Sequence, residues 1–282
     1  MIIIGKSQIA GGGTAKRLEF EYTGTYNERL DDGVVELLST GTLMVTKDTY
    51  IDAFLVGGGA SGTPGYYTTG YSSGSAPGGG GGASGCTKVI TNAFLQKNVE
   101  YPVVIGAGGP SAKTTAVPSQ GSGNSGGDTS AFGYTAKGGQ KSSGAGGGTG
   151  GSGGGGGGVG RSTSSGHDAG AGGADGANGA EGYGSGGTGQ GTTTREFGES
   201  TGKLYAGGGG GGRGFKGYDS GPNGAGGAGG GGDGAKSDAE LGGNGEANTG
   251  SGGGGGGGNI KSERTASGSG GSGIVCIRLH KE

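Results

Sequence analysis

The chain has 282 residues, of which 89 are glycine and only 27% are hydrophobic. Glycine averages about 7% in proteins, so side chains alone cannot build the core that a domain of this length normally buries. The balance of 20 Lys and Arg against 22 Asp and Glu gives a net charge of −2. It forms no basic stripe, which argues against nucleic-acid binding.

The first 56 residues have an ordinary composition and predict several strands. Leu18, Phe20 and Tyr22 alternate with Glu19 and Glu21, the pattern of a half-buried strand. Val35 and Leu37 continue this pattern, and further strands are predicted at 43–45, after a turn at 39–42, and at 51–56. The last of these runs directly into three glycines, so a strand ends where a glycine tract begins.

Three further strand signals follow along the chain. Residues 87–105 alternate on both sides of Leu95–Asn98 and predict a hairpin. Residues 130–136 predict one short strand with Phe132 and Tyr134 on the same face. The last strand is expected at 274–279, and no helix start is followed by helical periodicity.

Apolar strands at the two ends of the chain can only be buried against each other, so the glycine-rich segments must leave the strands and return. The sequence from Gly170 reads GAG-GAD-GAN-GAE, and that from Gly221 reads GPN-GAG-GAG. A period of three fits the polyproline-II helix, whose backbone groups point sideways. Without Cβ atoms such helices can approach and bond laterally, with the non-glycine residues outward. Collagen is excluded because the repeat breaks and only six prolines occur.

The predicted fold is therefore mainly β. A small antiparallel β-sandwich base, formed by N-terminal, two internal and C-terminal strands, carries a packed bundle of polyglycine-II helices with few or no α-helices. The predicted division is an N-terminal attachment segment at 1–33, a β-framework with the first glycine-rich excursions at 34–137 plus 270–282, and a polyglycine-II body at 138–269.

Motifs for chemistry are weak. Patterns built on glycine match by chance in such a sequence, and none has the strand and helix context of a nucleotide or nucleophile site. His167 and His280 are expected to be loop residues. Cys86 and Cys276 are expected to be buried and reduced, with a bond between them left open. We predict no enzyme, no catalytic residue, no metal and no cofactor.

The far end of the bundle is the candidate binding site. Tyr with Ser, Gly and Asn is typical of antibody-like binding loops, although such rings can also simply cap the glycine helices. The predicted end loops are 63–76, 110–120, 159–168, 213–223 and 246–249, with 250–258 returning to the base and Leu204–Tyr205 contacting it. The predicted receptor-binding residues are Tyr66, Tyr67, Tyr71, Arg213, Phe215, Lys216 and Tyr218.

Four segments resemble glycine-rich proteins of tailed phages and prophages. They are residues 51–59, 103–109, 192–212 and 271–279. The organisation from residue 34 onward is similar to the polyglycine-II distal tail-fibre adhesins of T-even phages, where loops at one end of the helix bundle touch the bacterial receptor. Residues 1–33 are shorter than the fibre-binding domain of those adhesins.

The resemblance implies a tail-tip adhesin. Its partners would be a bacterial surface receptor, protein or glycan, and another tail-fibre or baseplate protein, with no nucleic acid and no membrane insertion. We expect the protein to be made in the host cytoplasm without a signal peptide and to reside in the virion at the tail tip. The alternatives are a structural tail spacer without receptor contact and an ice-binding protein.

Overall fold

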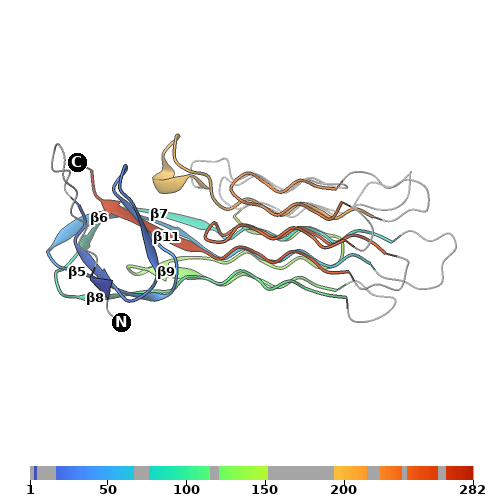
Figure 1. The fold of residues 1–282 in the computed structure, drawn as a ribbon, viewed down its shortest axis with the longest axis horizontal. Helices are drawn as coiled ribbons and strands as arrows, with labels where there is room; N and C mark the ends of the chain where they lie inside the picture. The colour runs from blue at the N-terminus through green and yellow to red at the C-terminus, as the bar shows by residue number, and fades with distance from the viewer. Residues whose placement is uncertain are drawn as a thin grey trace.

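The computed structural model describes residues 3–4, 17–66, 76–114, 121–151, 194–214, 223–236, 240–259 and 265–281. The strands gather at one end as a base, and the glycine-rich runs extend from it side by side as an elongated body (Figure 1). The described residues include the 3-10 turn η2 (Glu196–Gly198) and contain no α-helix. The fold is mainly β, as the sequence predicts.

All strand pairs in the base are antiparallel. A four-stranded sheet has the spatial order β1 (Ile3–Ile4), β2 (Phe20–Tyr22), β5 (Gly41–Val45) and β8 (Glu100–Val103). A five-stranded sheet has the order β3 (Tyr26–Arg29), β4 (Val34–Leu37), β11 (Ile274–Leu279), β6 (Thr49–Val56) and β7 (Thr87–Leu95). The last strand of the chain thus lies in the centre of the larger sheet, between β4 and β6.

The two sheets bury one apolar core between them. Leu43 and Val45 from the smaller sheet pack with Leu37, Leu55 and Ile277 from the larger one, and all five are fully buried. The alternation in β2 places Phe20 and Tyr22 in the same core, as expected for a strand with one buried face. The base is therefore an antiparallel sandwich stabilised in the usual way, by removal of apolar surface from water.

Two features of the base differ from the sequence prediction. Residues 130–136 form a hairpin of β9 (Thr129–Ala131) and β10 (Tyr134–Ala136), not one strand. Phe132 and Gly133 both have left-handed φ, 54° and 80°, which suits a tight two-residue turn. β3 was not predicted, and with β2 it lies inside the segment 1–33 that we assigned to attachment.

The body consists of extended glycine-rich runs whose backbones bond laterally. In run 57–66, the N–H groups of residues 57, 60, 63 and 66 donate to the carbonyls of 86, 83, 80 and 77. Those of residues 58 and 61 donate to 127 and 124, and those of 59 and 62 to 271 and 268. Every third residue thus faces the same neighbour, which is the period of a polyglycine-II helix.

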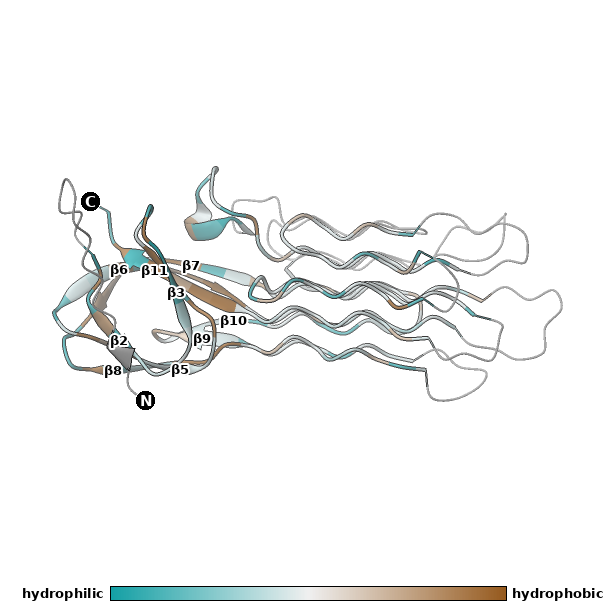
Figure 2. Cartoon of the chain, in the orientation of Figure 1, coloured by the Kyte–Doolittle hydropathy of each residue, from teal (hydrophilic) through white to brown (hydrophobic). Residues whose placement is uncertain are grey.

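Run 250–259 shows the packing most fully, because six other runs bond to it. Its N–H groups donate to runs 207–213, 60–66 and 240–243, again in steps of three. Its carbonyls accept from runs 79–85, 232–235 and 268–271. All ten residues from 250 to 259 are buried, and eight of them are glycine. The body therefore has an interior made of backbone. Figure 2 shows it as a largely pale bundle, whereas the brown stretches lie mainly in the base.

Runs on the outside of the body keep one residue in three exposed. In run 223–228 these are Ala225 and Ala228, and in run 231–236 they are Asp233 and Lys236. The prediction that Ala and acidic residues point outward is confirmed for Ala225, Ala228 and Asp233, but Ala235 is buried. The repeat that starts at Gly170 lies outside the described residues.

Candidate functional site

The ends of several runs meet at the end of the body farthest from the base (Figure 1). Tyr66 lies at the end of run 57–66, where its N–H donates to the Pro77 carbonyl at 2.9 Å and its carbonyl accepts from Asn259 N–H at 3.0 Å. Arg213 lies at the end of run 207–214, where its carbonyl accepts from Gly258 N–H at 2.8 Å. Because Gly258 and Asn259 are consecutive, Tyr66 and Arg213 flank the end of the same buried run.

These are the two predicted site residues that the structure describes, and both lie at the far end. Tyr67, Tyr71, Phe215, Lys216 and Tyr218 lie outside the described residues. So do most of the predicted end loops, including all of 159–168.

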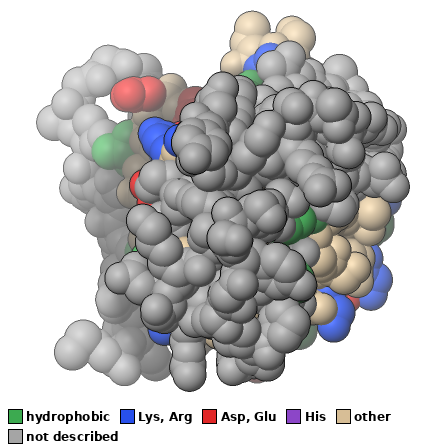
Figure 3. Space-filling model, turned by 90° about the vertical axis from the view of Figure 1, so that its right-hand side faces the viewer, with side chains coloured by type: hydrophobic (Ala, Val, Ile, Leu, Met, Phe, Trp, Pro, Cys, Tyr) green, Lys and Arg blue, Asp and Glu red, His purple; other side chains and the backbone are tan. Residues whose placement is uncertain are grey.

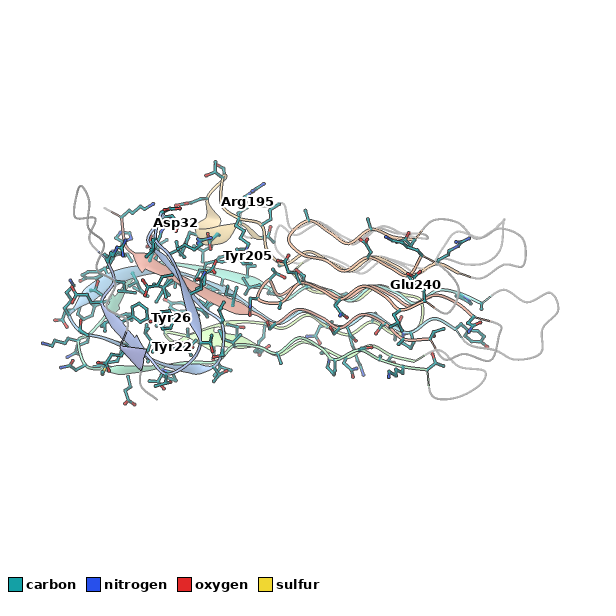
Figure 4. The ribbon with its side chains drawn as sticks, in the orientation of Figure 1. Tyr22, Tyr26, Asp32, Arg195, Tyr205 and Glu240 are labelled. Carbon is teal, nitrogen blue, oxygen red and sulfur yellow. The ribbon has the colours of Figure 1, made fainter. Side chains whose placement is uncertain are left out.

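The Arg213 side chain is held in place by the neighbouring run. Its Nη1 donates to the Lys236 carbonyl at 2.9 Å, and the Lys236 N–H donates to Glu240 Oε2 at 2.8 Å. Lys236 also lies 3.9 Å from Asp233, an exposed ion pair that contributes little stability. Figure 4 shows Glu240 on the part of the body away from the base, and Figure 3, viewed onto that end, shows Lys and Arg side chains at several places around it.

A small buried polar cluster, which was not predicted, lies beside Gly65, the residue before Tyr66. The hydroxyls of Thr114 and Thr265 are 3.1 Å apart, and both donate to the Gly65 carbonyl, at 3.2 and 2.8 Å. Both threonines are buried. Thr114 follows Gly109 by five residues and Thr265 follows Gly258 by seven, so no sequence signal marks either as part of this cluster.

The predicted end loop 246–249 is wrong. Its Glu246 N–H donates to Gly230, and the Thr249 carbonyl accepts from Ala206 N–H, next to the base. Gly229 and Gly230, with φ of 97° and 101°, make an earlier turn of the chain, and this turn lies beside residues 246–249 at the base end of the body. Run 250–259 consequently leads away from the base, opposite to the predicted direction, and the chain returns through 265–273.

The contact predicted for Tyr205 at the base is confirmed. Tyr205 is fully buried with its ring centroid 5.4 Å from that of Phe54, and its hydroxyl donates to Glu196 at 3.1 Å. Its hydroxyl is also 3.7 Å from Cys276 Sγ. Burial raises the pKa of both the Tyr205 hydroxyl and the Cys276 thiol well above their ordinary values. Both groups therefore stay neutral, and the thiol is not in its nucleophilic form.

The two cysteines are free, as predicted, but only Cys276 is buried. Cys86 is half-buried because it stands where β7 meets the body. His280, expected to be a simple loop residue, lies with Nδ1 2.6 Å from Asp52 Oδ1. His167 lies outside the described residues. Among the described residues, no three His, Cys, Asp or Glu side chains are placed to hold a metal ion.

One groove of about 500 Å³ lies in the base, between β7, β8 and the β9–β10 hairpin. Phe94, Tyr101, Phe132 and Tyr134 line it, with Phe94 51% and Tyr134 44% exposed. It carries aromatic surface at the end of the molecule opposite to Tyr66. In the part of the chain that the structure describes, there is no helix of the length and apolarity that spanning a membrane requires.

Sequence comparison identifies the family. The model of a glycine-rich domain matches residues 38–280, most of the chain. The protein belongs to this glycine-rich domain family. A search of curated proteins gives no match.

Proposed function

We propose that this glycine-rich domain protein is a phage or prophage-derived tail-tip adhesin that binds a bacterial surface receptor, protein or glycan, through the far end of its body. The observation that carries the proposal is the position of Tyr66 and Arg213. Both flank the end of the buried run 250–259, at the end of the molecule opposite to the base.

The backbone packing supports a presenting role for the body. Seven residues of a polyglycine-II helix span about 22 Å, and run 250–259 is bonded to six neighbours along its length. Such a body holds its far end at a fixed distance from the base. A stiff support lowers the ordering cost when the loops at its end bind a partner.

The opposite end supports attachment to a tail. β1 and β11, the first and last strands of the described chain, both belong to the base. Another tail-fibre or baseplate protein would hold the base, and the body would point away from it. In this arrangement the protein resides at the tail tip of the virion.

The test is attachment of the purified protein to a panel of whole bacteria. One variant replaces all seven predicted receptor-binding residues with Ala, namely Tyr66, Tyr67, Tyr71, Arg213, Phe215, Lys216 and Tyr218. The matched control replaces Tyr50 and Tyr134, which are 53% and 44% exposed at the base, with Ala. We expect the first variant to lose attachment and the control to keep it. Undiminished attachment by the first variant, when folded, would contradict the proposal, and absence of attachment by the wild type would favour a tail spacer.

Ice binding is a separate outcome with its own measurement. The outer runs of the body carry charged residues such as Asp128, Asp233 and Lys236 in their exposed positions. A regular face of small uncharged residues is therefore interrupted. Thermal hysteresis of the wild-type protein would contradict this argument and favour ice binding.

A further inference from the structure

The second half of the body, which comprises runs 207–214, 223–228, 231–236 and 240–245, joins the base differently from the first half. Run 57–66 continues directly from β6, and run 265–273 leads directly into β11. Run 207–214 instead follows residues 194–206, which we call the strap. The described part of the chain has no named strand between Ala136 and Ile274, so no sheet fixes where these four runs begin.

The strap packs on the outer face of the five-stranded sheet. The rings of Phe197 and Tyr205 lie 6.4 and 5.4 Å from that of Phe54, and all three are buried with Ile274 and Cys276. Arg195 and Leu204 form an antiparallel bridge that closes the strap on itself. Figure 4 shows Tyr205 where base and body meet.

Charged groups from two strands hold the strap in addition to this apolar contact. Glu196, 5% exposed, accepts from Arg29 Nη2 of β3 at 2.6 Å and from the Tyr205 hydroxyl. Glu199 pairs with Arg278 of β11 at 2.7 Å, and the Arg278 guanidinium lies 4.1 Å from the centroid of the Phe197 ring.

Buried ion pairs are weak evidence for stability, because removing two charges from water offsets much of their attraction. Their best-attested use is to specify one register among alternatives. Two non-glycine residues of the strap, Phe197 and Ala206, also have left-handed φ of 53° and 58°. Such strain persists only where the surroundings over-determine the conformation.

A register must be specified here, because the backbone ladder itself repeats. The N–H groups of residues 207, 210 and 213 donate to the carbonyls of 229, 232 and 235. The carbonyls of 207, 210 and 213 in turn accept from the N–H groups of 252, 255 and 258. A shift of run 207–214 by three residues brings each donor opposite an equivalent acceptor. Backbone bonding inside a glycine tract therefore does not distinguish the native position from one displaced by about 9 Å.

We propose that the strap is the register lock of the second half of the body. Tyr205 and Glu196 act as positioning residues. Tyr205 lies two residues before the tract Gly207–Gly212 and is fully buried against Phe54, with its hydroxyl bonded to Glu196. The rigid tract then fixes Arg213 at the far end. A shift of three residues toward the base would place Arg213 where Gly210 lies. This shift is blocked, because a Cβ at that position would be 2.5 Å from the carbonyl carbon of Gly224.

The test is hydrogen exchange of backbone amides, measured by peptide mass spectrometry on the full chain. Tyr205→Phe keeps the ring against Phe54 and removes the hydroxyl that bonds Glu196, and Glu196→Gln removes the charge that faces Arg29. We expect exchange in runs 207–214 and 231–236 to rise about fivefold or more, with runs 57–66 and 106–114 unchanged. The matched control is Tyr134→Phe, on an exposed tyrosine of the base.

Two results would overturn the proposal. One is unchanged exchange in runs 207–214 and 231–236 for Tyr205→Phe. The other is an equal rise in both halves of the body, which would show a general loss of stability in place of a local lock. If Glu196→Gln does not fold, the folded Tyr205→Phe variant decides between these outcomes. The result does not depend on the receptor, since no bacterial attachment is measured.

Discussion

The base and the body of this molecule are stabilised by opposite means. In the base, side chains such as Leu37, Leu43 and Ile277 fill the space between two sheets. In the body, run 250–259 is equally buried but has almost no side chains, and its neighbours are held by backbone hydrogen bonds. A cavity is therefore the characteristic defect of the base, and an added carbon atom is the characteristic defect of the body.

The largest effect is expected from an added side chain in the interior of the body. A Cβ at Gly255 would overlap the Gly79 carbonyl, lying 2.5 Å from its carbon, and would be 2.8 Å from Gly212 N. Both neighbours are backbone and cannot rotate away. We predict that Gly255→Val destabilises the protein by more than the roughly 1–3 kcal/mol of ordinary overpacking. A thermal melt with an unchanged midpoint would refute backbone packing.

The corresponding defect in the base is a deletion. Leu43 is fully buried between the sheets, and Leu43→Ala is expected to cost about 2–5 kcal/mol. Leu241→Ala is the matched control, because Leu241 is 63% exposed on the body. Urea unfolding of the two variants measures the difference. Equal midpoints would mean that the sandwich core does not limit stability.

The sequence predicted the base better than the course of the body. Alternation identified β2, which has one buried face. Continuous apolar runs identified β6 and β11, which are buried over consecutive residues. β3, with the sequence Tyr-Asn-Glu-Arg, has no buried residue and no apolar alternation, so pattern reasoning missed it. The Phe132–Gly133 turn was missed because its strands are only three residues long.

In the body, the sequence predicted the kind of packing but not the direction of each run. The turn at Gly229 and Gly230 consists of glycine, as the straight tracts do, so the sequence does not distinguish the turn from a tract. Once that turn was overlooked, 246–249 was placed at the wrong end. Tyr66 and Arg213 were found because each is a large side chain directly beyond a glycine-rich tract. The buried Glu196 was missed because its partner, Arg29, is 167 residues away.

A pH-dependent contribution is expected from the base. Burial would raise the pKa of Asp52, but hydrogen bonds from His280 and from the Asn92 N–H, with the charge of Arg278, hold it below its ordinary value. A carboxyl whose folded pKa is lowered stabilises the protein above its unfolded pKa of about 3.9, and this contribution is lost as the pH falls through the folded pKa. We predict that Asp52→Asn is destabilising at pH 7 and progressively less so as the pH falls below the unfolded pKa of about 3.9, by urea unfolding. A constant difference across this range would exclude the linkage.

A smaller effect is expected where glycine is needed for its conformation and not for space. Gly133 has φ of 80°, and nothing lies within 4 Å of the position of its missing Cβ. Gly133→Ala should cost about 1–2 kcal/mol from the left-handed conformation alone. Gly133→Asn should recover part of this, since Asn tolerates that conformation. Equal melting midpoints for the Ala and Asn variants would point to a cause other than φ.

The smallest effect is expected at the outward positions of the body, and Ala225 offers the closest comparison. Ala225 is exposed on run 223–228, whereas a Cβ on the next residue, Gly226, would overlap the Gly231 carbonyl and lie 3.0 Å from the Gly232 carbonyl carbon. Serine introduced at each of these adjacent residues thus separates the two environments of a polyglycine-II run. Ala225→Ser should change stability by no more than about 0.5 kcal/mol, as exposed substitutions usually do, while Gly226→Ser should lower the melting midpoint clearly. If both variants melt together with the wild type, run 223–228 does not pack against its neighbours. If both melt early, the run has no outward face, and the rule that one residue in three is free to vary fails for the body.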